Sequence, residues 1–269
     1  MTTGAPEALS MAVRLQDRVV LITGAGGTIG LESASRLLQE GARLSLLDIS
    51  TTALDKAMEQ LKPLIPADQE ASSRIIAIKT DVTVAADMEA ATAKTVDTFG
   101  RLDCAFLNAG ISYSSTSIFD TTEELYEKLM AINVKSAFLG IRATGKAMRD
   151  LGNGGSIIIT SSIAGLRGTP GLILYSGSKY AVRGFAQTAA NELGQYGIRV
   201  NTIHPSGVDG VMFRNTWSPE KLQSLLDAMP LGRFAQASDI SSVVAFLASD
   251  DSKFMTGGFM KVDGGCINF

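Results

Sequence analysis

The feature of this sequence that most constrains its fold is an alternation of short apolar runs with longer helical stretches. A continuous apolar run is typical of a strand buried on both faces, and a helix between successive runs favours parallel pairing. The runs occupy residues 19–22, 43–48, 74–79, 103–107, 156–160, 198–203 and 259–262. The stretches between them predict helices at 28–40, 50–61, 87–99, 122–150, 172–196 and 238–249. Right-handed crossovers then give an α/β fold, a doubly wound parallel sheet with helices on both faces.

The length of 269 residues fits either one large domain or two small ones. The chain has no internal repeat and no linker, so we expect a single domain over residues 15–269 after a flexible N-terminal arm at residues 1–14. The segment 205–230 breaks the alternation and contains Trp217 and Pro219. Because long irregular insertions in compact domains often cover a site, we expect residues 208–230 to form a substrate lid.

Composition and charge argue against several classes of protein. The net charge of −3 gives no reason to expect a nucleic-acid or anionic-membrane partner. No apolar run approaches the roughly 18 residues of a transmembrane helix, and the first residues contain no basic stretch of the kind that opens a signal peptide. Cys104, Cys266 and the single histidine, His204, are too few for a zinc site. We therefore expect a cytoplasmic protein without a metal, whose two cysteines are buried and reduced.

A glycine-rich turn between the first apolar run and the first helix indicates a nucleotide site. Residues 23–30 read Thr-Gly-Ala-Gly-Gly-Thr-Ile-Gly, and this context is the one that a dinucleotide fingerprint requires. Glycines let the backbone approach a pyrophosphate, and the helix N-terminus presents free N–H groups. Asp48 and Asp81 follow the next two runs, where the first can accept hydrogen bonds from the adenosine ribose and the second lies near the adenine. For each acid, capping of the next helix is the alternative.

The same residues predict NAD(H) as the preferred cofactor, with NADP(H) less favoured. The loop from Gly24 to Gly30 has no basic residue, and Asp48 is followed by Ile49 and Ser50. Arg43 begins the second run and should point to its opposite end. A carboxylate at the ribose accepts hydrogen bonds from the 2′ and 3′ hydroxyls of NAD, whereas it repels the 2′-phosphate of NADP.

Tyr175 and Lys179 are four residues apart and share one face of a predicted helix. A secondary alcohol must lose a proton as its hydride leaves, and a phenol can take or give that proton. A free phenol has a pKa near 10, and a neighbouring ammonium lowers it. Ser162, just past the fifth run, can hydrogen-bond the substrate oxygen. Asn133 lies inside a predicted helix although asparagine is a poor helix former, and such a residue is more often a solvated surface residue than a functional one. We expect His204 to be structural.

Together these pieces resemble the short-chain dehydrogenase/reductase family, in its branch of about 250 residues. The resemblance runs from about Gln16 to the C-terminus. Its markers are Thr23–Gly30, Asn108-Ala109-Gly110, Asn133-Val134, Ser161-Ser162, Tyr175–Lys179, Pro205 with Gly207-Val208, and Val262–Gly265.

The resemblance implies a Rossmann-like fold and a catalytic tetrad of Asn133, Ser162, Tyr175 and Lys179. In it, the tyrosine is the general acid/base and the serine orients the substrate oxygen. The lysine holds the nicotinamide ribose and lowers the tyrosine pKa, and the asparagine holds a water of a proton relay. The implied cofactor residues are Gly24, Thr28, Ile29, Gly30, Asp48, Asp81, Val82, Asn108, Ala109, Gly110, Tyr175, Lys179, Pro205 and Val208. The implied substrate residues are Ser162, Tyr175, Val211, Met212, Phe213 and Trp217.

Two positions depart from the family pattern. Thr28 stands where the family usually has its second glycine, so its Cβ lies where the backbone should come close, although its hydroxyl can cap the helix or touch a phosphate. Leu107 replaces the first asparagine of Asn-Asn-Ala-Gly, a neutral apolar change in a buried strand. Neither touches the tetrad, so we expect altered cofactor contacts and retained activity.

The leading hypothesis is an oxidoreductase that moves a hydride between NAD(H) and a secondary alcohol or ketone, apolar and cyclic or otherwise bulky. A 3-oxoacyl thioester reductase and a non-catalytic cofactor-sensing protein are the alternatives. The thioester reductase usually needs NADPH and a basic surface, so the negative net charge and Asp48 argue against it. The sensing protein would have no need of Tyr175 together with Lys179. The resemblance also implies a homotetramer that pairs the helices 122–150 and 172–196. The second helix carries the small residues Gly184, Ala186, Ala189 and Ala190.

Overall fold

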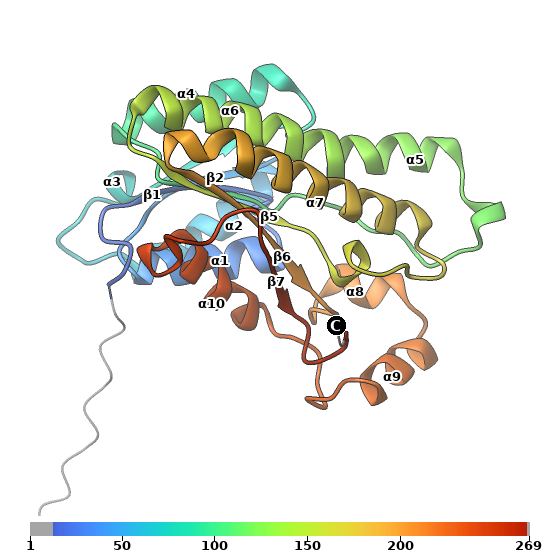
Figure 1. Cartoon of the computed structure of the whole chain (residues 1–269). Coiled ribbons are helices and arrows are strands. Elements are labelled where there is room, and N and C mark those ends of the chain that lie inside the picture. Colours follow the sequence, from blue (N-terminus) through green and yellow to red (C-terminus); the bar gives the residue numbers. More distant parts are fainter. Residues whose placement is uncertain (1–12, 268–269) are drawn as a thin grey trace, which may run out of the picture.

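The structure, a computed structural model, describes residues 13–267. Its strands are β1 (Val19–Thr23), β2 (Arg43–Asp48), β3 (Ile75–Lys79), β4 (Cys104–Leu107), β5 (Gly155–Thr160), β6 (Ile198–Pro205) and β7 (Phe259–Val262). They form one sheet in the order β3-β2-β1-β4-β5-β6-β7, and each neighbouring pair is parallel (Figure 1). The predicted α/β fold, a single domain with a doubly wound parallel sheet, is confirmed.

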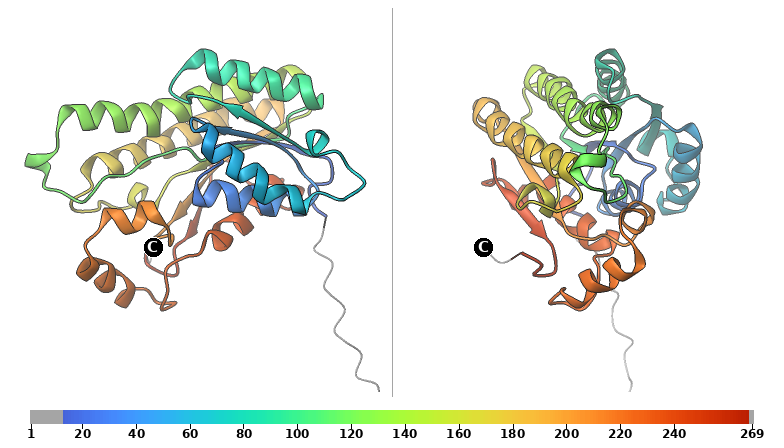
Figure 2. Two further views of the ribbon diagram at one scale, coloured as in Figure 1. Left: turned by 180° about the vertical axis from the view of Figure 1, so that it is seen from behind. Right: turned by 90° about the vertical axis from the view of Figure 1, so that its right-hand side faces the viewer.

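Helices cover both faces of the sheet (Figure 2). One face carries α1 (Thr28–Gln39), α2 (Thr51–Leu61) and α10 (Ala237–Ala248), and the other carries α4 (Ala85–Phe99), α6 (Ser136–Leu151) and α7 (Ile173–Leu193). Successive side chains of a strand point to opposite faces, so Val20 and Ile22 of β1 enter the first core while Val19 and Leu21 enter the second. Burial on both sides explains why the strands are continuous apolar runs.

The topology places a site at the carboxyl ends of β1 and β4. The chain leaves β1 toward β2 on one side, whereas β4 pairs with β1 on the other side. This reversal of strand order separates the two following loops and leaves a crevice between them, which is where ligands bind in such sheets. The predicted glycine turn and the segment that begins at Asn108 are those two loops.

The predicted helix over residues 122–150 is continuous but not uniform. It consists of α5 (Glu123–Met130), a π-helical turn (Ala131–Lys135) and α6. α5 begins at Thr122, whose hydroxyl accepts a hydrogen bond from Leu125 N. α6 ends at Gly152 in the left-handed conformation. The π turn inserts one extra residue into the helical winding, and such turns are frequent at functional sites.

The expectation of an irregular segment at 205–230 is wrong in detail. Two short helices, α8 (Val211–Thr216) and α9 (Pro219–Asp227), occupy it. α9 has an ordinary start, because the Ser218 hydroxyl accepts from Lys221 N and Pro219 stands in the first helical turn. A third short helix, α3 (Ala71–Arg74), precedes β3 and was also not predicted.

The predicted N-terminal arm is too long by at least its last residue. Its first twelve residues lie outside the described part of the chain. Arg14 already forms a two-point ion pair with Glu40, at 2.8 Å for both contacts, and the Glu40 side chain is almost fully buried. Leu15 is fully buried. The fold therefore holds the chain from Arg14 onward.

Two smaller expectations also need correction. Cys104 is buried, as expected, but Cys266 is only partly buried, and its Sγ lies 3.5 Å from Nη2 of Arg167. Ala186, Ala189 and Ala190 are buried in the protein's own core, so they are not free to line a subunit interface. Within residues 13–267, no helix is long and apolar enough to cross a membrane.

Candidate active site

The loop after β1 turns sharply and opens α1. Gly24 adopts a φ of +62°, and its carbonyl accepts from Gly27 N at 3.2 Å. A Cβ on Gly30 would lie 2.2 Å from that carbonyl oxygen, so only glycine lets the helix pack on the turn. No side chain caps α1 at Gly27. The first N–H groups of α1, at Thr28 and Ile29, are therefore available to an anion, a geometry that fits a pyrophosphate.

Asp48 lies beside this loop at the end of β2. Its Oδ2 accepts from Gly26 N at 3.0 Å and its Oδ1 accepts from Ser50 N at 3.0 Å, which orients the carboxylate and leaves acceptor capacity for ribose hydroxyls. Lys79 of β3 is in register with Asp48 and exposed. Lys79 is a basic neighbour of Asp48 that the loop and Arg43 do not reveal, because register between strands is not visible in one sequence.

Asp81 serves the turn into α4. Its Oδ1 accepts from both the backbone N and the hydroxyl of Thr83, at 2.9 and 2.7 Å, and its own N–H donates to Asp87. The alternative of a helix cap is wrong for Asp81, because Val84 is the N-cap of α4 and no side chain caps that helix, and a contact of Asp81 with adenine stays a prediction. Val82, next along the chain, packs against the core beneath α4.

Asn108 ties together the ends of three strands. Its backbone N–H and that of Ala109 donate to the Thr23 hydroxyl of β1, at 3.0 and 3.1 Å. Its Oδ1 accepts from the Thr160 hydroxyl of β5 at 3.0 Å, and its Nδ2 donates to Gly24 O at 3.4 Å. The segment after β4 is therefore held against the glycine loop, and a place for Asn108 beside the cofactor stays a prediction.

The π turn brings Asn133 into the interior, where it is 2% exposed. Its Oδ1 accepts from Ile111 N at 2.8 Å, and its Nδ2 donates to Ile111 O at 2.9 Å and to the Ser178 hydroxyl at 3.1 Å. Asn133 thus clamps the segment after β4 onto α7. The alternative reading, a solvated surface asparagine, is wrong because the local winding turns this side chain inward.

Asn133 and Lys179 approach each other over Gly110. A Cβ on Gly110 would lie 3.3 Å from Oδ1 of Asn133 and 3.5 Å from Nζ of Lys179, so the bare backbone leaves room for both groups. The Lys179 ammonium donates to Thr160 O at 2.8 Å and is almost fully buried. Burial lowers the pKa of Lys179 to about 8.

Tyr175 and Ser162 complete the group. The Ser162 hydroxyl approaches that of Tyr175, and Nζ of Lys179 lies 5.5 Å from the centre of the Tyr175 ring. Burial raises the pKa of Tyr175 above its ordinary value, although the nearby Ser162 hydroxyl acts in the opposite direction. The predicted lowering of this pKa by Lys179 is therefore not found in the protein by itself, because the ammonium is directed to Thr160 and burial dominates.

His204 supports the site from behind. It is fully buried, with Nδ1 at 2.7 Å from Ser162 O and Nε2 at 2.8 Å from the Thr202 hydroxyl. Burial lowers the pKa of His204 to about 4, so the ring is neutral at neutral pH. A carbonyl can only accept, so we assign the ring proton to Nδ1. The expected structural role is supported, and Pro205, the next residue, lies with its carbonyl 3.5 Å from the Ser162 hydroxyl.

The four apolar residues of the expected substrate wall do not form one surface. Val211 and Met212 are 73% and 51% exposed, so their side chains face solvent. The Phe213 ring packs against Phe234, with ring centres 4.9 Å apart. Trp217 lines a hollow. The side chains of the short helix α8 point in different directions. The sequence could not indicate this, because no helix was predicted in this segment.

Val208 and Thr28 lie where the lid segment meets the cofactor loop. Val208 forms an isolated parallel bridge with Ala235. A Cβ on Gly210 would lie 3.2 Å from the Thr28 hydroxyl, so Thr28 faces the lid segment. Its suggested capping role is wrong, because Gly27 is the N-cap of α1.

Leu107, the other departure from the family pattern, has a packing role. It is 5% exposed, and a Cβ on Gly140 of α6 would lie 2.7 Å from its side chain. Leu107 thus fills the space that a glycine leaves on α6. The substitution is accommodated within the core, as expected of an apolar residue in a buried strand.

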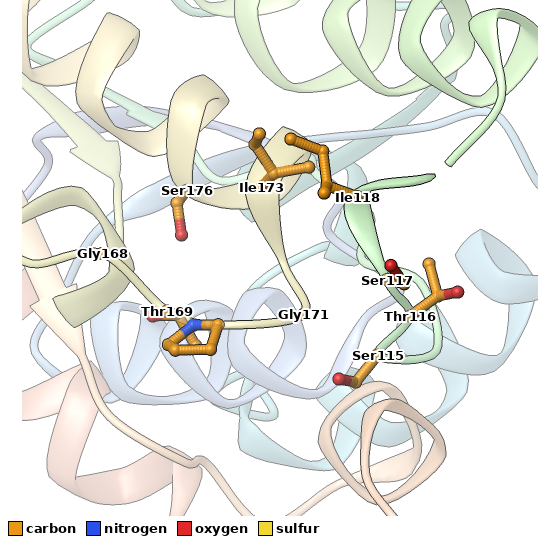
Figure 3. A pocket seen from close by; sticks show the side chains of 10 residues that line it. Ser115, Thr116, Ser117, Ile118, Gly168, Thr169, Gly171, Ile173 and Ser176 are labelled. Carbon is orange, nitrogen blue, oxygen red and sulfur yellow. The ribbon is translucent and has the colours of Figure 1, made fainter. Parts of the chain in front are cut away.

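Two hollows open between the segments around the tetrad. The larger, of about 860 Å³, lies between residues 115–118 and 168–171 and the start of α7 (Figure 3). Ser176, the neighbour of Tyr175, lines it with a buried hydroxyl that has no hydrogen-bond partner among the described residues. The smaller, of about 480 Å³, shares Ser115 and Pro170 with it and reaches Trp217.

Sequence reasoning missed three residues that hold the site together. Ser178 bridges Asn133 to Tyr175 O, and its position inside the segment from Tyr175 to Lys179 was a usable signal. Thr160 binds both Asn108 and Lys179 from the end of β5. Tyr113 bonds the start of α7, and nothing in its surroundings in the sequence indicated this.

Comparison with known proteins assigns the chain to a family. The family profile described as "Enoyl-(Acyl carrier protein) reductase" matches residues 24–266. The chain is 34% identical to levodione reductase of Leifsonia aquatica, over 95% of this chain and 96% of that one. The chain belongs to the short-chain dehydrogenase/reductase family. It is also 33% identical to cyclohexanol dehydrogenase of Acinetobacter sp., over 94% of this chain and 96% of that one.

Solved structures of the family are similar throughout. The crystal structure of levodione reductase has a TM-score of 0.87 and covers 94% of this chain and 98% of its own. The NAD⁺-bound xylitol dehydrogenase structure, 31% identical, has a TM-score of 0.86 and covers 94% of this chain and all of its own. This short-chain dehydrogenase/reductase is therefore an oxidoreductase by family.

Proposed function

We propose that this enzyme transfers a hydride between NAD(H) and a secondary alcohol or ketone that is apolar and cyclic or otherwise bulky. The observation that carries the proposal is the convergence of four side chains at the ends of β4 and β5: Asn133 and Lys179 meet over Gly110, the Tyr175 ring lies 5.5 Å from Nζ of Lys179, and the Ser162 hydroxyl approaches the phenol. Levodione reductase and cyclohexanol dehydrogenase, both named for cyclic substrates, support the substrate class.

The roles of the tetrad follow from its contacts. Tyr175 is the general acid/base, and its raised pKa keeps the phenol protonated, ready to donate to a ketone oxygen during reduction. Ser162 hydrogen-bonds the same oxygen and is held by Ala164 N, which donates to its hydroxyl at 3.1 Å. Lys179 binds the nicotinamide ribose and supplies positive charge near the phenol. Asn133 fixes the segment at Ile111 and holds the water of a proton relay.

The bound cofactor would supply the hydride as NADH when a ketone is reduced and would accept it as NAD⁺ when an alcohol is oxidised. The open turn from Gly24 to Gly30 would hold its pyrophosphate, and Asp48 would hold the adenosine ribose. Asp81 and Val82 would face the adenine, and Asn108, Ala109 and Gly110 the adenosine half. Pro205 and Val208 would meet the nicotinamide carboxamide.

Three further properties are part of the proposal. Residues 208–230, with α8 and α9, act as the substrate lid. The protein is a cytoplasmic homotetramer, and the exposed apolar residues of α6 and α7 support this assembly: Phe138, Leu151 and Phe185. A nucleic acid or membrane partner has no support in the net charge of −3.

A substrate panel tests the proposal. We expect purified protein to oxidise NADH with cyclohexanone and its substituted relatives, followed by NADH absorbance. Turnover with acetoacetyl thioester and NADPH, and none with cyclic ketones, would favour the thioester reductase instead. Binding of NADH without turnover of any ketone, alcohol or thioester would favour the cofactor-sensing protein.

A further inference from the structure

A short segment connects the lid to the catalytic helix. This strap, residues 112–116, follows Ile111, which Asn133 clamps. Its backbone bonds two different parts of the molecule, because Ser115 N donates to Thr216 O at 2.9 Å and Thr116 N donates to Gly171 O at 3.1 Å. The strap therefore runs between the end of α8 and the loop that leads into α7.

Side chains strengthen the contact with the lid. The Ser114 hydroxyl donates to Asn215 O at 3.2 Å, and the Thr216 hydroxyl lies 3.4 Å from that of Ser112. Together with the bond from Ser115 N, these contacts join the last turn of α8 to the strap. A displacement of α8 would therefore displace the strap or break these hydrogen bonds.

Tyr113 joins the strap to α7. The N-cap of α7, Leu172, offers no side-chain acceptor to the first turn. The Tyr113 hydroxyl takes that place and accepts from Leu174 N at 3.1 Å, with Tyr175 N also directed to it. Unpaired N–H groups at a helix start need such an acceptor. Here the acceptor comes from a segment some sixty residues earlier and bonds the residue beside the catalytic tyrosine.

We propose that Tyr113 is a positioning residue that holds the first turn of α7, and with it the Tyr175 phenol, in register when the lid is seated on the strap. The proposal rests on the proposed function, because it assigns Tyr175 to the reaction. The strap transmits the position of α8 to α7 through the Tyr113 hydroxyl, beside the backbone bond from Thr116 N to Gly171 O. The lid and the acid/base are thereby aligned together, and the phenol is correctly placed only when the substrate is covered.

The test compares Tyr113→Phe with Tyr126→Phe, a matched control at an exposed tyrosine of α5. Tyr113→Phe removes only the accepting oxygen. We expect kcat for cyclohexanone to fall about fivefold, the fold-change of one lost hydrogen bond, with the KM for NADH unchanged. Amide hydrogen exchange in the peptide 172–178 should become faster. Tyr126→Phe should match the wild type in both measurements.

Ser114→Ala tests the contact between the strap and α8. It should also lower kcat, and the double variant Tyr113→Phe/Ser114→Ala should lose hardly more than Tyr113→Phe alone, because both changes weaken the same path from α8 to α7. Effects that multiply independently would overturn the coupling.

Three other results would overturn the positioning role. The first is an unchanged kcat in Tyr113→Phe. The second is a raised KM for the ketone at constant kcat, which would mean that Tyr113 contacts the substrate. The third is faster amide exchange without any kinetic change, which would mean that Tyr113 only caps the helix. Failure of the proposed function would look different, since the wild-type protein would then turn over no ketone at all.

Discussion

At the scale of single residues, the chemistry depends on a phenol whose surroundings keep it protonated. Burial raises the pKa of Tyr175 and lowers that of Lys179 to about 8, so at neutral pH the phenol is protonated and the lysine is still mostly an ammonium. This arrangement favours proton donation to a ketone. The ammonium of Lys179 has not lowered the pKa of Tyr175 in the protein by itself, so its contribution depends on its position near the phenol.

Tyr175→Phe should retain cofactor binding and lose most turnover, because it removes only the hydroxyl that transfers the proton. General acid–base catalysis typically contributes about 10² to 10⁴-fold, so kcat should fall within that range. Tyr180→Phe, at an exposed tyrosine of the same helix, is the control and should leave kcat unchanged. Steady-state kinetics with NADH, and a titration of NADH fluorescence, measure both quantities. Full activity in Tyr175→Phe would remove it from the mechanism.

Asp48 should set the preference for NAD(H) over NADP(H). A preference of tenfold in kcat/KM needs only about 1.4 kcal/mol, and a hydrogen bond to a charged group supplies roughly 1.5 to 3 kcal/mol. Asp48→Ala should raise the KM for NADH and narrow the preference, and Lys79 in the neighbouring strand should then help to accept the 2′-phosphate.

The double variant Asp48→Ala/Lys79→Ala separates the two charges. It should gain less activity with NADPH than Asp48→Ala alone. An unmodified protein with equal kcat/KM for both cofactors would show that Asp48 does not act on the ribose.

At the scale of elements, two local features shape the site: the π turn before α6 and the glycine at the start of α7. The π turn directs Asn133 inward, and Gly171, which has no side chain, leaves room for Ser115 of the strap. Both are departures from regular geometry that a helix or strand pattern does not encode. Each brings together segments from different crossovers of the sheet.

Gly171→Ala should displace the strap. Gly171 has a φ of +83°, and a Cβ there would lie 2.1 Å from the Ser115 hydroxyl oxygen. The left-handed conformation alone costs a non-glycine residue about 1–2 kcal/mol, so the melting temperature should fall by several degrees and kcat should fall with it. Gly168→Ala, in open space in the same loop, is the control and should be neutral in both. A Gly171→Ala protein as stable and active as the control would contradict the close approach.

At the scale of the whole molecule, His204 makes stability depend on pH. Its pKa is about 4 in the folded protein against an ordinary 6.5, so the unfolded chain binds more protons between these values. The contribution of His204 is complete above about pH 6.5 and is lost as the pH falls to about 4. The full loss is about 3 kcal/mol.

Chemical denaturation of the wild type and of His204→Gln from pH 7 to pH 4 measures this effect. The variant should be less stable at pH 7, since it disturbs the bond to Ser162 O, but its stability should fall less steeply with acid. Parallel slopes for the two proteins would show that His204 is accessible to protons in the folded state.

Assembly is the other property of the whole molecule. The Phe138 and Phe185 rings lie on neighbouring helices with centres 6.3 Å apart, and they are 49% and 37% exposed. Phe138→Asp should reduce the mass measured by light scattering at micromolar concentration from that of a tetramer, while far-UV circular dichroism remains unchanged. A wild-type protein that is monomeric at this concentration would contradict the proposed assembly.

Much of this protein was determined by its sequence alone. The apolar runs and glycine turn specify a parallel doubly wound sheet, because a strand buried on both faces needs apolar side chains throughout and a tight turn needs glycine. The spacing of Tyr175 and Lys179 likewise places both on one helix face. Only the tertiary structure decided that Asn133 points inward, that Lys79 lies beside Asp48, and that Tyr113 bonds the start of α7. These are contacts between segments distant in the chain, so they depend on register and packing, which no local pattern records.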